Sequence, residues 1–249
     1  MTASAIQIIP LGQMPEVRPG DNLAALVEAA LATVAAPQAG ADVLVVTQKI
    51  VSKAEGRFVD LAQVTPGARA IELAALTHKD PRLVELVLAE STAIVRAAPH
   101  VLIARHRLGH VMANAGIDRS NLGPGQGERA LLLPIDPDGT AAALAARLGC
   151  AVVISDSFGR PWRMGVGCVA LGAAGLPALI DRRGETDRDG RVLEVTQVAL
   201  ADLVASAAGL VMGEGSEGVP AALVRGCVWQ GPHKPAGALV RPVEQDLFA

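Results

Sequence analysis

The chain contains short continuous apolar runs, which are typical of strands, and also segments whose apolar residues recur at helical spacing, so strands and helices are mixed. Residues 42–47 form a run rich in β-branched residues, which predicts a strand buried on both faces. A similar run at 151–155 predicts a strand with the polar Asp156 at its carboxyl end. Further strands are predicted at 6–9, 101–104, 111–113, 131–133 and 219–225, and packed strands within 165–178.

Helices are predicted where apolar residues recur every three or four positions behind a capping residue. Asp21 is the expected cap of a helix that runs through Ala30, and Thr65 with Pro66 predicts a start near residue 67. Other helices are predicted at 81–95, from the turn at 136–139 to Gly149, and at 197–212. The Pro-rich tail from residue 231 predicts loose packing.

These elements predict an α+β fold, with mixed or antiparallel sheets and packed helices. They lack the regular βαβ alternation of a doubly wound sheet, and several predicted strands are neighbours along the chain. No segment has the composition of a linker. We therefore expect residues 1–249 to form a single unit of two intimately connected subdomains, whose internal boundary the pattern leaves open.

Composition and charge exclude several classes of protein. Hydrophobic residues make up 51% and the net charge is -3, which excludes intrinsic disorder and gives no general attraction to nucleic acid. The uncharged stretch 168–180 is shorter than the roughly 20 residues that a membrane-spanning helix needs. No signal-peptide pattern is present, so we expect a cytoplasmic protein with no membrane partner.

Two residue types draw attention by their placement. The three cysteines, Cys150, Cys168 and Cys227, are far apart, form no CxxC motif and are predicted to be small buried hydrophobes. Arg is the usual cation in this chain, yet Lys49 and Lys53 occur in one short segment directly after the strand at 42–47. If they lie on a helical turn, they share one face, where a polyphosphate would neutralise both. The alternative interpretation is two solvated lysines on a surface turn.

Three further segments carry polar groups suited to metal and phosphate binding. Residues 114–121 offer Asn, Asp and Ser oxygens, although ordinary turn chemistry explains the same residues. Asp156 and Ser157 resemble a Mg²⁺ or Mn²⁺ site beside phosphates, with Arg160 and Arg163 as a candidate anion clamp; the alternative is an Asx turn. Residues 212–220 form a glycine-rich loop with Glu214, which fits neither a Walker loop nor a dinucleotide fingerprint and could be a helix cap.

Asp118, Asp156 and Glu214 make an all-oxygen set, and the five histidines show no zinc-ligand spacing. This donor chemistry indicates Mg²⁺ or Mn²⁺ and argues against zinc.

Taken in order, these segments resemble the coenzyme F420-0:L-glutamate ligase family. Six motifs, spread over most of the chain, carry the resemblance. They are DVLVVTQKIVSKAEG at 42–56, NAGIDRSN at 114–121, LLLPIDPDG at 131–139, VVISDSFGRPWR at 152–163, LEVT at 193–196 and MGEGSEGVP at 212–220.

The resemblance implies an enzyme that uses GTP to join L-glutamate to the carboxylate of F420-0. The acid would first become an acyl phosphate, because a free carboxylate is a poor acyl donor, and the products would include GDP and phosphate. The resemblance leaves open whether further γ-linked glutamates are added. The family uses two divalent ions per site, Mg²⁺ or Mn²⁺, some members favour K⁺ as well, and a homodimer is expected.

The resemblance also assigns roles to residues. Asp118 and Asp156 would bind the first metal ion, and Ser157, where the family often has Thr, would bind the second with Glu214. Asp118, Asp156 and Lys53 form the expected catalytic set. The expected nucleotide-binding residues are Met14, Pro15, Glu16, Val17, Gln48, Lys49, Lys53, Asn121, Met212, Gly213, Glu214, Gly215, Ser216, Glu217, Gly218 and Val219.

Three alternative functions stay open on the sequence alone. A ligase could join an amino acid to a different acid, because pocket shape sets acid specificity. A metal-dependent phosphohydrolase would use water in place of the amine. A non-catalytic nucleotide-binding domain would need phosphate contacts but no paired metal ligands.

Overall fold

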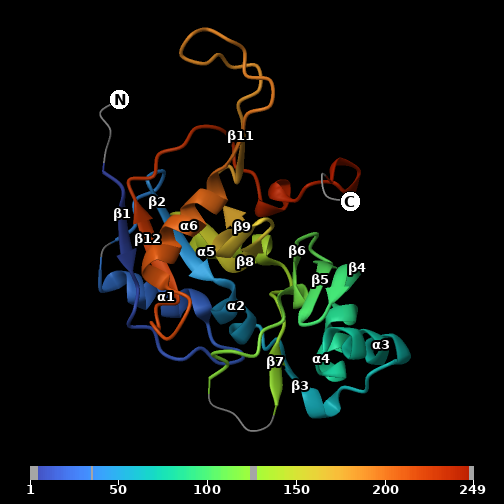
Figure 1. Cartoon of the computed structure of the whole chain (residues 1–249). Helices are drawn as coiled ribbons and strands as arrows, with labels where there is room; N and C mark the ends of the chain where they lie inside the picture. The colour runs from blue at the N-terminus through green and yellow to red at the C-terminus, as the bar shows by residue number, and fades with distance from the viewer. Residues whose placement is uncertain (1–4, 35, 124–127, 247–249) are drawn as a thin grey trace.

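A five-stranded mixed sheet forms the centre of the larger lobe. The computed structural model describes residues 5–34, 36–123 and 128–246. Within them the strand order is β1-β12-β2-β8-β9, and only the β2–β8 pair is parallel (Figure 1). The bounds are β1 (Gln7–Pro10), β12 (Ala221–Arg225), β2 (Asp42–Thr47), β8 (Ala151–Arg160) and β9 (Arg163–Ala174).

Helices cover both faces of this sheet. Helices α1 (Leu23–Ala32) and α5 (Pro137–Leu148) pack on the face that carries Leu44, Val46 and Val152. Helix α6 (Leu200–Met212) packs on the opposite face, against Val43 and Val45. Because β2 is buried on both faces, its sequence is a continuous apolar run, and the predicted strand at 42–47 is confirmed to the residue.

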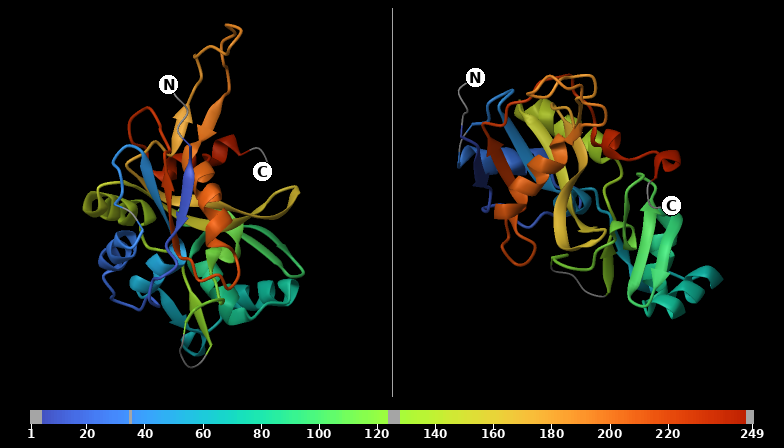
Figure 2. Two further views of the ribbon diagram at one scale, coloured as in Figure 1. Left: turned by 90° about the vertical axis from the view of Figure 1, so that its left-hand side faces the viewer. Right: turned by 45° about the horizontal axis from the view of Figure 1, so that its top comes forward.

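A smaller lobe stands beside the larger one in the right-hand view of Figure 2. It has an apolar core of its own. Helices α3 (Ala68–Thr77) and α4 (Pro81–Ala89) pack beside a three-stranded antiparallel sheet, and a two-stranded ribbon of β3 (Phe58–Asp60) with β7 (Arg129–Leu131) connects the lobes. The small sheet contains β4 (Ser91–Ala98), β5 (Val101–His106) and β6 (Val111–Ala113). The predicted α+β class is confirmed.

Strand register aligns the segments that carry the candidate chemistry. In the parallel β2–β8 pair Thr47 lies opposite Ser155, so helix α2 (Gln48–Ala54) begins beside Asp156. Strand β12 runs antiparallel to β2, and the Thr47 N–H donates to the carbonyl of Pro220 at 2.9 Å. The glycine-rich loop before β12 therefore reaches the same edge of the sheet.

Several predicted boundaries are wrong, because sheet pairing overrides local pattern. The helix expected at 81–95 ends at Ala89, and Ser91–Ala98 pairs with β5. The strand that begins at Ala151 does not end at Ser155: it continues to Arg160, because Asp156 and Ser157 pair with β9. The strand expected at 131–133 is Arg129–Leu131, and residues 197–199 form β11 before α6 begins.

Two predicted caps are also wrong. Asn22, not Asp21, caps α1, by accepting from the Ala25 N–H at 3.1 Å. Helix α3 has Gly67 at its cap position, whose N–H donates to Glu85, so Thr65 has no capping role. By contrast, Asp136 and Gly149 do bound α5 as expected.

The remaining segments lie at the periphery. A charged arm extends from the short pair of β10 (Leu179–Asp181) and β11 (Gln197–Ala199) (Figure 1). The tail is more tightly packed than predicted, since Ala236 is fully buried and its N–H donates to Asp138. Short 3₁₀ turns occur at η1 (Leu61–Gln63), η2 (Asn114–Gly116), η3 (Ala236–Leu239) and η4 (Val243–Gln245). Of the helices that the described residues form, none has the length and apolar character needed to cross a bilayer.

Candidate active site

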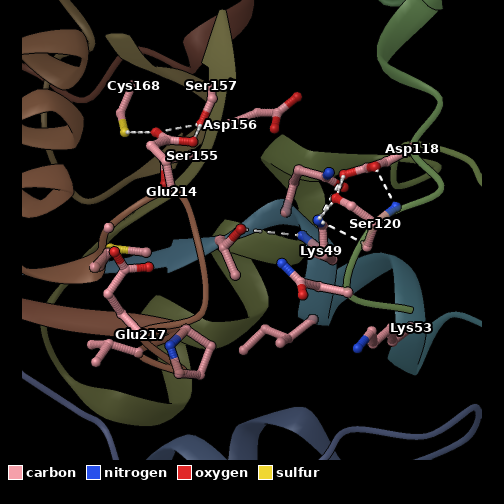
Figure 3. Close-up of a pocket in the computed structure, with 18 of the residues that line it drawn as sticks. Lys49, Lys53, Asp118, Ser120, Ser155, Asp156, Ser157, Cys168, Glu214 and Glu217 are labelled. Atoms are coloured by element: carbon pink, nitrogen blue, oxygen red, sulfur yellow. Dashed lines mark hydrogen bonds and ion pairs between the residues drawn. The ribbon is translucent and has the colours of Figure 1, made fainter. Parts of the chain in front are cut away.

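A cavity of about 710 Å³ lies where the end of the central sheet meets the smaller lobe. Every residue predicted to bind metal or nucleotide lines it, although they come from five separate stretches of the chain. They are Met14–Val17, Gln48, Lys49, Lys53, Asp118, Asn121, Asp156, Ser157 and Met212–Val219. In Figure 3, Glu214, Ser157 and Cys168 gather on one side, Lys49, Asp118 and Ser120 on the other, and Asp156 lies between them.

Lys49 and Asp118 connect the two lobes inside this cavity. The Lys49 ammonium lies 2.6 Å from Asp118 Oδ2, and it also lies 3.2 Å from both the carbonyl and the hydroxyl oxygen of Ser120. Burial raises the pKa of Asp118, but hydrogen bonds from Lys49 and from the Ser120 N–H outweigh it and hold that pKa below its usual range.

Lys53 has a different carboxylate partner. Its ammonium forms an ion pair with Glu16, and its side chain is only 6% exposed. The interpretation of two solvated surface lysines is therefore wrong for Lys53. Each ammonium contacts its own carboxylate, so no single protein carboxylate neutralises both lysines, and neutralisation of the pair by a polyphosphate stays a prediction. Their shared helix still places both at the cavity wall.

Asp156 occupies a poorly solvated position between the two groups of side chains. Desolvation raises the pKa of its carboxyl to about 7, and the negative charge of Asp118 adds to the effect. Hydrogen bonds from the Ser157 N–H and from the Gln48 side chain oppose the shift. Because few hydrogen-bond donors offset the desolvation, a cation beside Asp156 would stabilise its ionised form.

Ser157 and Glu214 form the second polar pair. The Ser157 hydroxyl lies 2.6 Å and 2.5 Å from the two carboxylate oxygens of Glu214. Cys168 Sγ lies 3.5 Å from the same carboxylate, because Cys168 is opposite Ser157 in the β8–β9 pair. Burial, followed by the Glu214 charge, raises the pKa of the Cys168 thiol to about 11.

The glycine-rich loop is held in place by its own polar contacts. Helix α6 ends at Met212, and the capping residue Gly213 has a φ of +72° and a ψ of 179° that suit glycine alone. The chain therefore turns sharply there, and Glu214 enters the cavity. Glu217 accepts from the Gly215 N–H at 2.8 Å. The Asn121 side chain donates to the Gly215 carbonyl at 3.1 Å, which links this loop to the smaller lobe.

The charges around the cavity favour a bound cation. Among the described lining residues five are carboxylates and two are ammonium groups, and both ammonium groups contact carboxylates. The net negative charge of the cavity would repel a polyphosphate unless cations bound together with it. No three His, Cys, Asp or Glu side chains of the described chain converge on one point. The donors instead form two oxygen-rich groups, Asp118 with Asp156 and Ser157 with Glu214, which suit hard divalent ions.

A sequence model of the family described as F420-0:Gamma-glutamyl ligase matches residues 12–226. That span contains the smaller lobe, most of the larger lobe and every described segment of the cavity. The chain belongs to this family. It is therefore an enzyme of a ligase family, and the family resemblance read from the six motifs is confirmed.

Curated relatives of the family match almost the whole chain. Coenzyme F420:L-glutamate ligase of Methanopyrus kandleri is 45% identical, over 98% of this chain and 97% of its own length. The protein of the same name from Methanothermobacter thermautotrophicus is 43% identical, over 98% of both chains. That from Halobacterium salinarum is 46% identical, over 94% of this chain and 92% of its own.

The cavity also contains groups that the sequence did not indicate. Ser120 and Phe158 also line the cavity, and Cys168 does so although a purely apolar environment was predicted for it. Cys150 and Cys227 are buried as expected. Arg160 and Arg163 do not line the cavity, and Arg160 donates to the carbonyl of Met164, so the cavity gives no support to the candidate anion clamp. The local pattern did not mark Cys168, since it shares a strand face with the buried Ala170, and only the pairing of β9 with β8 places it opposite Ser157.

Proposed function

We propose that this protein joins L-glutamate to coenzyme F420-0 with the energy of GTP, through an acyl phosphate. The observation that carries the proposal is the single cavity in which lysines, oxygen-rich metal donors and a glycine-rich loop converge. It is supported by the family membership and by relatives of similar length that are named coenzyme F420:L-glutamate ligase.

The proposed cofactors are two divalent ions, Mg²⁺ or Mn²⁺, with K⁺ as an additional requirement to test. Asp118 and Asp156 would hold one ion and Ser157 with Glu214 the other. Bound ions would neutralise the crowded phosphates and stabilise charge on the transferred phosphoryl group. The carboxylate-rich lining of the cavity is the observation that supports this part of the proposal.

The protein's own groups then have distinct tasks. Lys53 would contact the phosphates from the α2 side, and its burial would fix the position of its ammonium. Backbone N–H groups of the loop 213–219 would contact the nucleotide, since glycines allow close approach. Asn121, through Gly215, would keep that loop against the smaller lobe.

One reaction mixture tests the proposal. Purified protein is incubated with F420-0, L-glutamate, GTP and Mn²⁺, products are weighed by mass spectrometry, and GDP release is followed in parallel. A product heavier by one or more glutamyl units, formed only with GTP, supports the ligase. GDP release with no heavier product indicates hydrolysis or another acid substrate, and the absence of both contradicts the proposal. The same protein is expected to be a homodimer by light scattering.

A further inference from the structure

The contacts of Lys49 use the whole hydrogen-bonding capacity of its ammonium. That group has three donors, and three oxygens surround it: Asp118 Oδ2 at 2.6 Å, and the carbonyl and hydroxyl of Ser120 at 3.2 Å each. A carboxylate, a carbonyl and a hydroxyl are also the kinds of oxygen that hard metal ions take. The ammonium thus lies among oxygens suited to a divalent cation.

The Asp118 carboxylate is oriented toward that position by its own turn. Asp118 Oδ1 accepts from the Ser120 N–H at 2.7 Å, and Oδ2 is 3.1 Å from the Ser120 hydroxyl. These contacts do not involve Lys49, so the carboxylate keeps its direction if the ammonium leaves. Lys49 extends toward Asp118 from the larger lobe, where it lies in the first turn of α2. Its side chain is 20% exposed.

We infer that Lys49 and a divalent cation compete for the Asp118 carboxylate. The inference rests on the proposed function, in which Asp118 is a metal ligand. Two cations at one carboxylate oxygen repel each other, so binding of the ion displaces the ammonium. The displaced ammonium remains at the cavity wall, where the phosphates of a nucleotide would receive it. Metal and nucleotide therefore favour each other's binding, and by the same factor in both directions.

Lys53 provides a matched control within the same helix. It carries the same charge, lines the same cavity and contacts Glu16 in place of Asp118. Its removal changes the overall charge of the cavity as much as removal of Lys49 does, but frees no oxygen of Asp118. A comparison of the two variants separates direct competition from a general electrostatic effect.

The experiment measures Mn²⁺ binding to the full chain without nucleotide, by electron paramagnetic resonance of free Mn²⁺. Lys49→Met should bind Mn²⁺ on the order of tenfold more tightly than wild type, whereas Lys49→Arg and Lys53→Met should stay within about threefold. In the same proteins, Mn²⁺ should raise the affinity for GDP strongly in wild type and much less in Lys49→Met. Circular dichroism and thermal unfolding establish that each variant is folded.

Three outcomes overturn the inference. Lys49→Met could leave the Mn²⁺ affinity unchanged or weaken it; Lys49→Met and Lys53→Met could tighten it equally; or Asp118→Asn could bind Mn²⁺ as tightly as wild type. The third also removes Asp118 from the proposed metal ligands. Product mass tests the ligase activity separately. If the protein makes glutamylated F420 but gives either of the first two results, the competition is overturned and the proposed ligase function stands.

Discussion

Ser157 and Glu214 are 57 positions apart in the chain, yet the Ser157 hydroxyl lies within 2.6 Å of both Glu214 carboxylate oxygens. Strand β8 supplies the hydroxyl, and the loop after α6 supplies the carboxylate. The pair joins one central strand to the glycine-rich loop, so the position of each group depends on the other.

The first prediction concerns this pair. Ser157→Ala removes the hydroxyl that orients Glu214, and we expect kcat/KM for glutamate addition to fall by roughly 10–100-fold. Ser157→Thr keeps the hydroxyl and should retain most of the activity. Steady-state kinetics at several Mn²⁺ concentrations checks both variants. Equal kinetics for Ser157→Ala and wild type at limiting Mn²⁺ would show that the pair is only a structural contact.

The second prediction concerns Asp156. Asp156→Asn preserves the shape of the side chain but removes its negative charge, so we expect activity to fall on the order of a hundredfold or more. Thermal stability should be unchanged or slightly higher, because a poorly solvated carboxyl is replaced by a neutral amide. Near-normal turnover at ordinary metal concentration would remove Asp156 from the site.

The third prediction concerns Lys53. Lys53→Ala removes an ammonium from the cavity wall, and GTP affinity measured by calorimetry should weaken by about tenfold. Glu16→Gln is the matched control: it breaks the same ion pair but keeps the ammonium, so GTP should bind at least as tightly as in wild type. If both substitutions weaken GTP binding equally, the pair acts by holding the cavity wall in place.

The fourth prediction concerns Gly213, at the end of α6. Its φ of +72° and ψ of 179° are reached at low cost only by glycine. A Cβ there would lie 2.3 Å from the Glu217 carboxyl carbon, so this flexible side chain would rotate away and give up its hydrogen bond from the Gly215 N–H. Gly213→Ala should therefore lower the free energy of unfolding by about 1–3 kcal/mol and reduce activity by displacing Glu214. Chemical denaturation and kinetics check this.

Gly218→Ala serves as the control for Gly213, in the same loop. Its φ is +67°, but a Cβ there meets nothing within 4 Å. The cost should be confined to backbone strain of roughly 1 kcal/mol. If the two substitutions cost the same, displacement of the Glu217 carboxylate by the added methyl group has no energetic consequence.

The fifth prediction concerns the pH dependence of stability and His106 in the smaller lobe. Its side chain is fully buried, and its Nδ1 accepts from the Leu108 N–H at 3.0 Å. Desolvation, reinforced by the Arg107 charge, lowers its pKa from 6.5 to about 4. Between those values the unfolded chain binds a proton that the folded chain does not, so stability falls as pH decreases from about 6.5 to about 4.

The loss should amount to about 3 kcal/mol over that interval. His106→Asn keeps an acceptor for the Leu108 N–H and removes the titration. Its free energy of unfolding should therefore approach that of wild type as the pH falls through this window. A difference between the two proteins that is constant from pH 7 to pH 4 would contradict the prediction.

Where the signal is local, the sequence was a reliable guide. The strand Asp42–Thr47 follows from an apolar run buried on both faces, and the limits of α5 follow from Asp136 and Gly149. Where strand pairing competes with helical periodicity, the local pattern was misleading. Residues 91–95 fit a helix by pattern, yet pairing with β5 places them in a strand.

By itself, the sequence determined which residue types the cavity contains and the family to which the chain belongs. It also determined the mixed α+β character, because the spacing of apolar residues along the chain distinguishes strands from helices. Only the tertiary structure decided which groups meet. The parallel β2–β8 register brings α2 beside Asp156, and the approach of the smaller lobe pairs Lys49 with Asp118 and leaves Lys53 to Glu16. Such pairings depend on packing between segments tens of residues apart, and the residues around each partner carry no local signal for them.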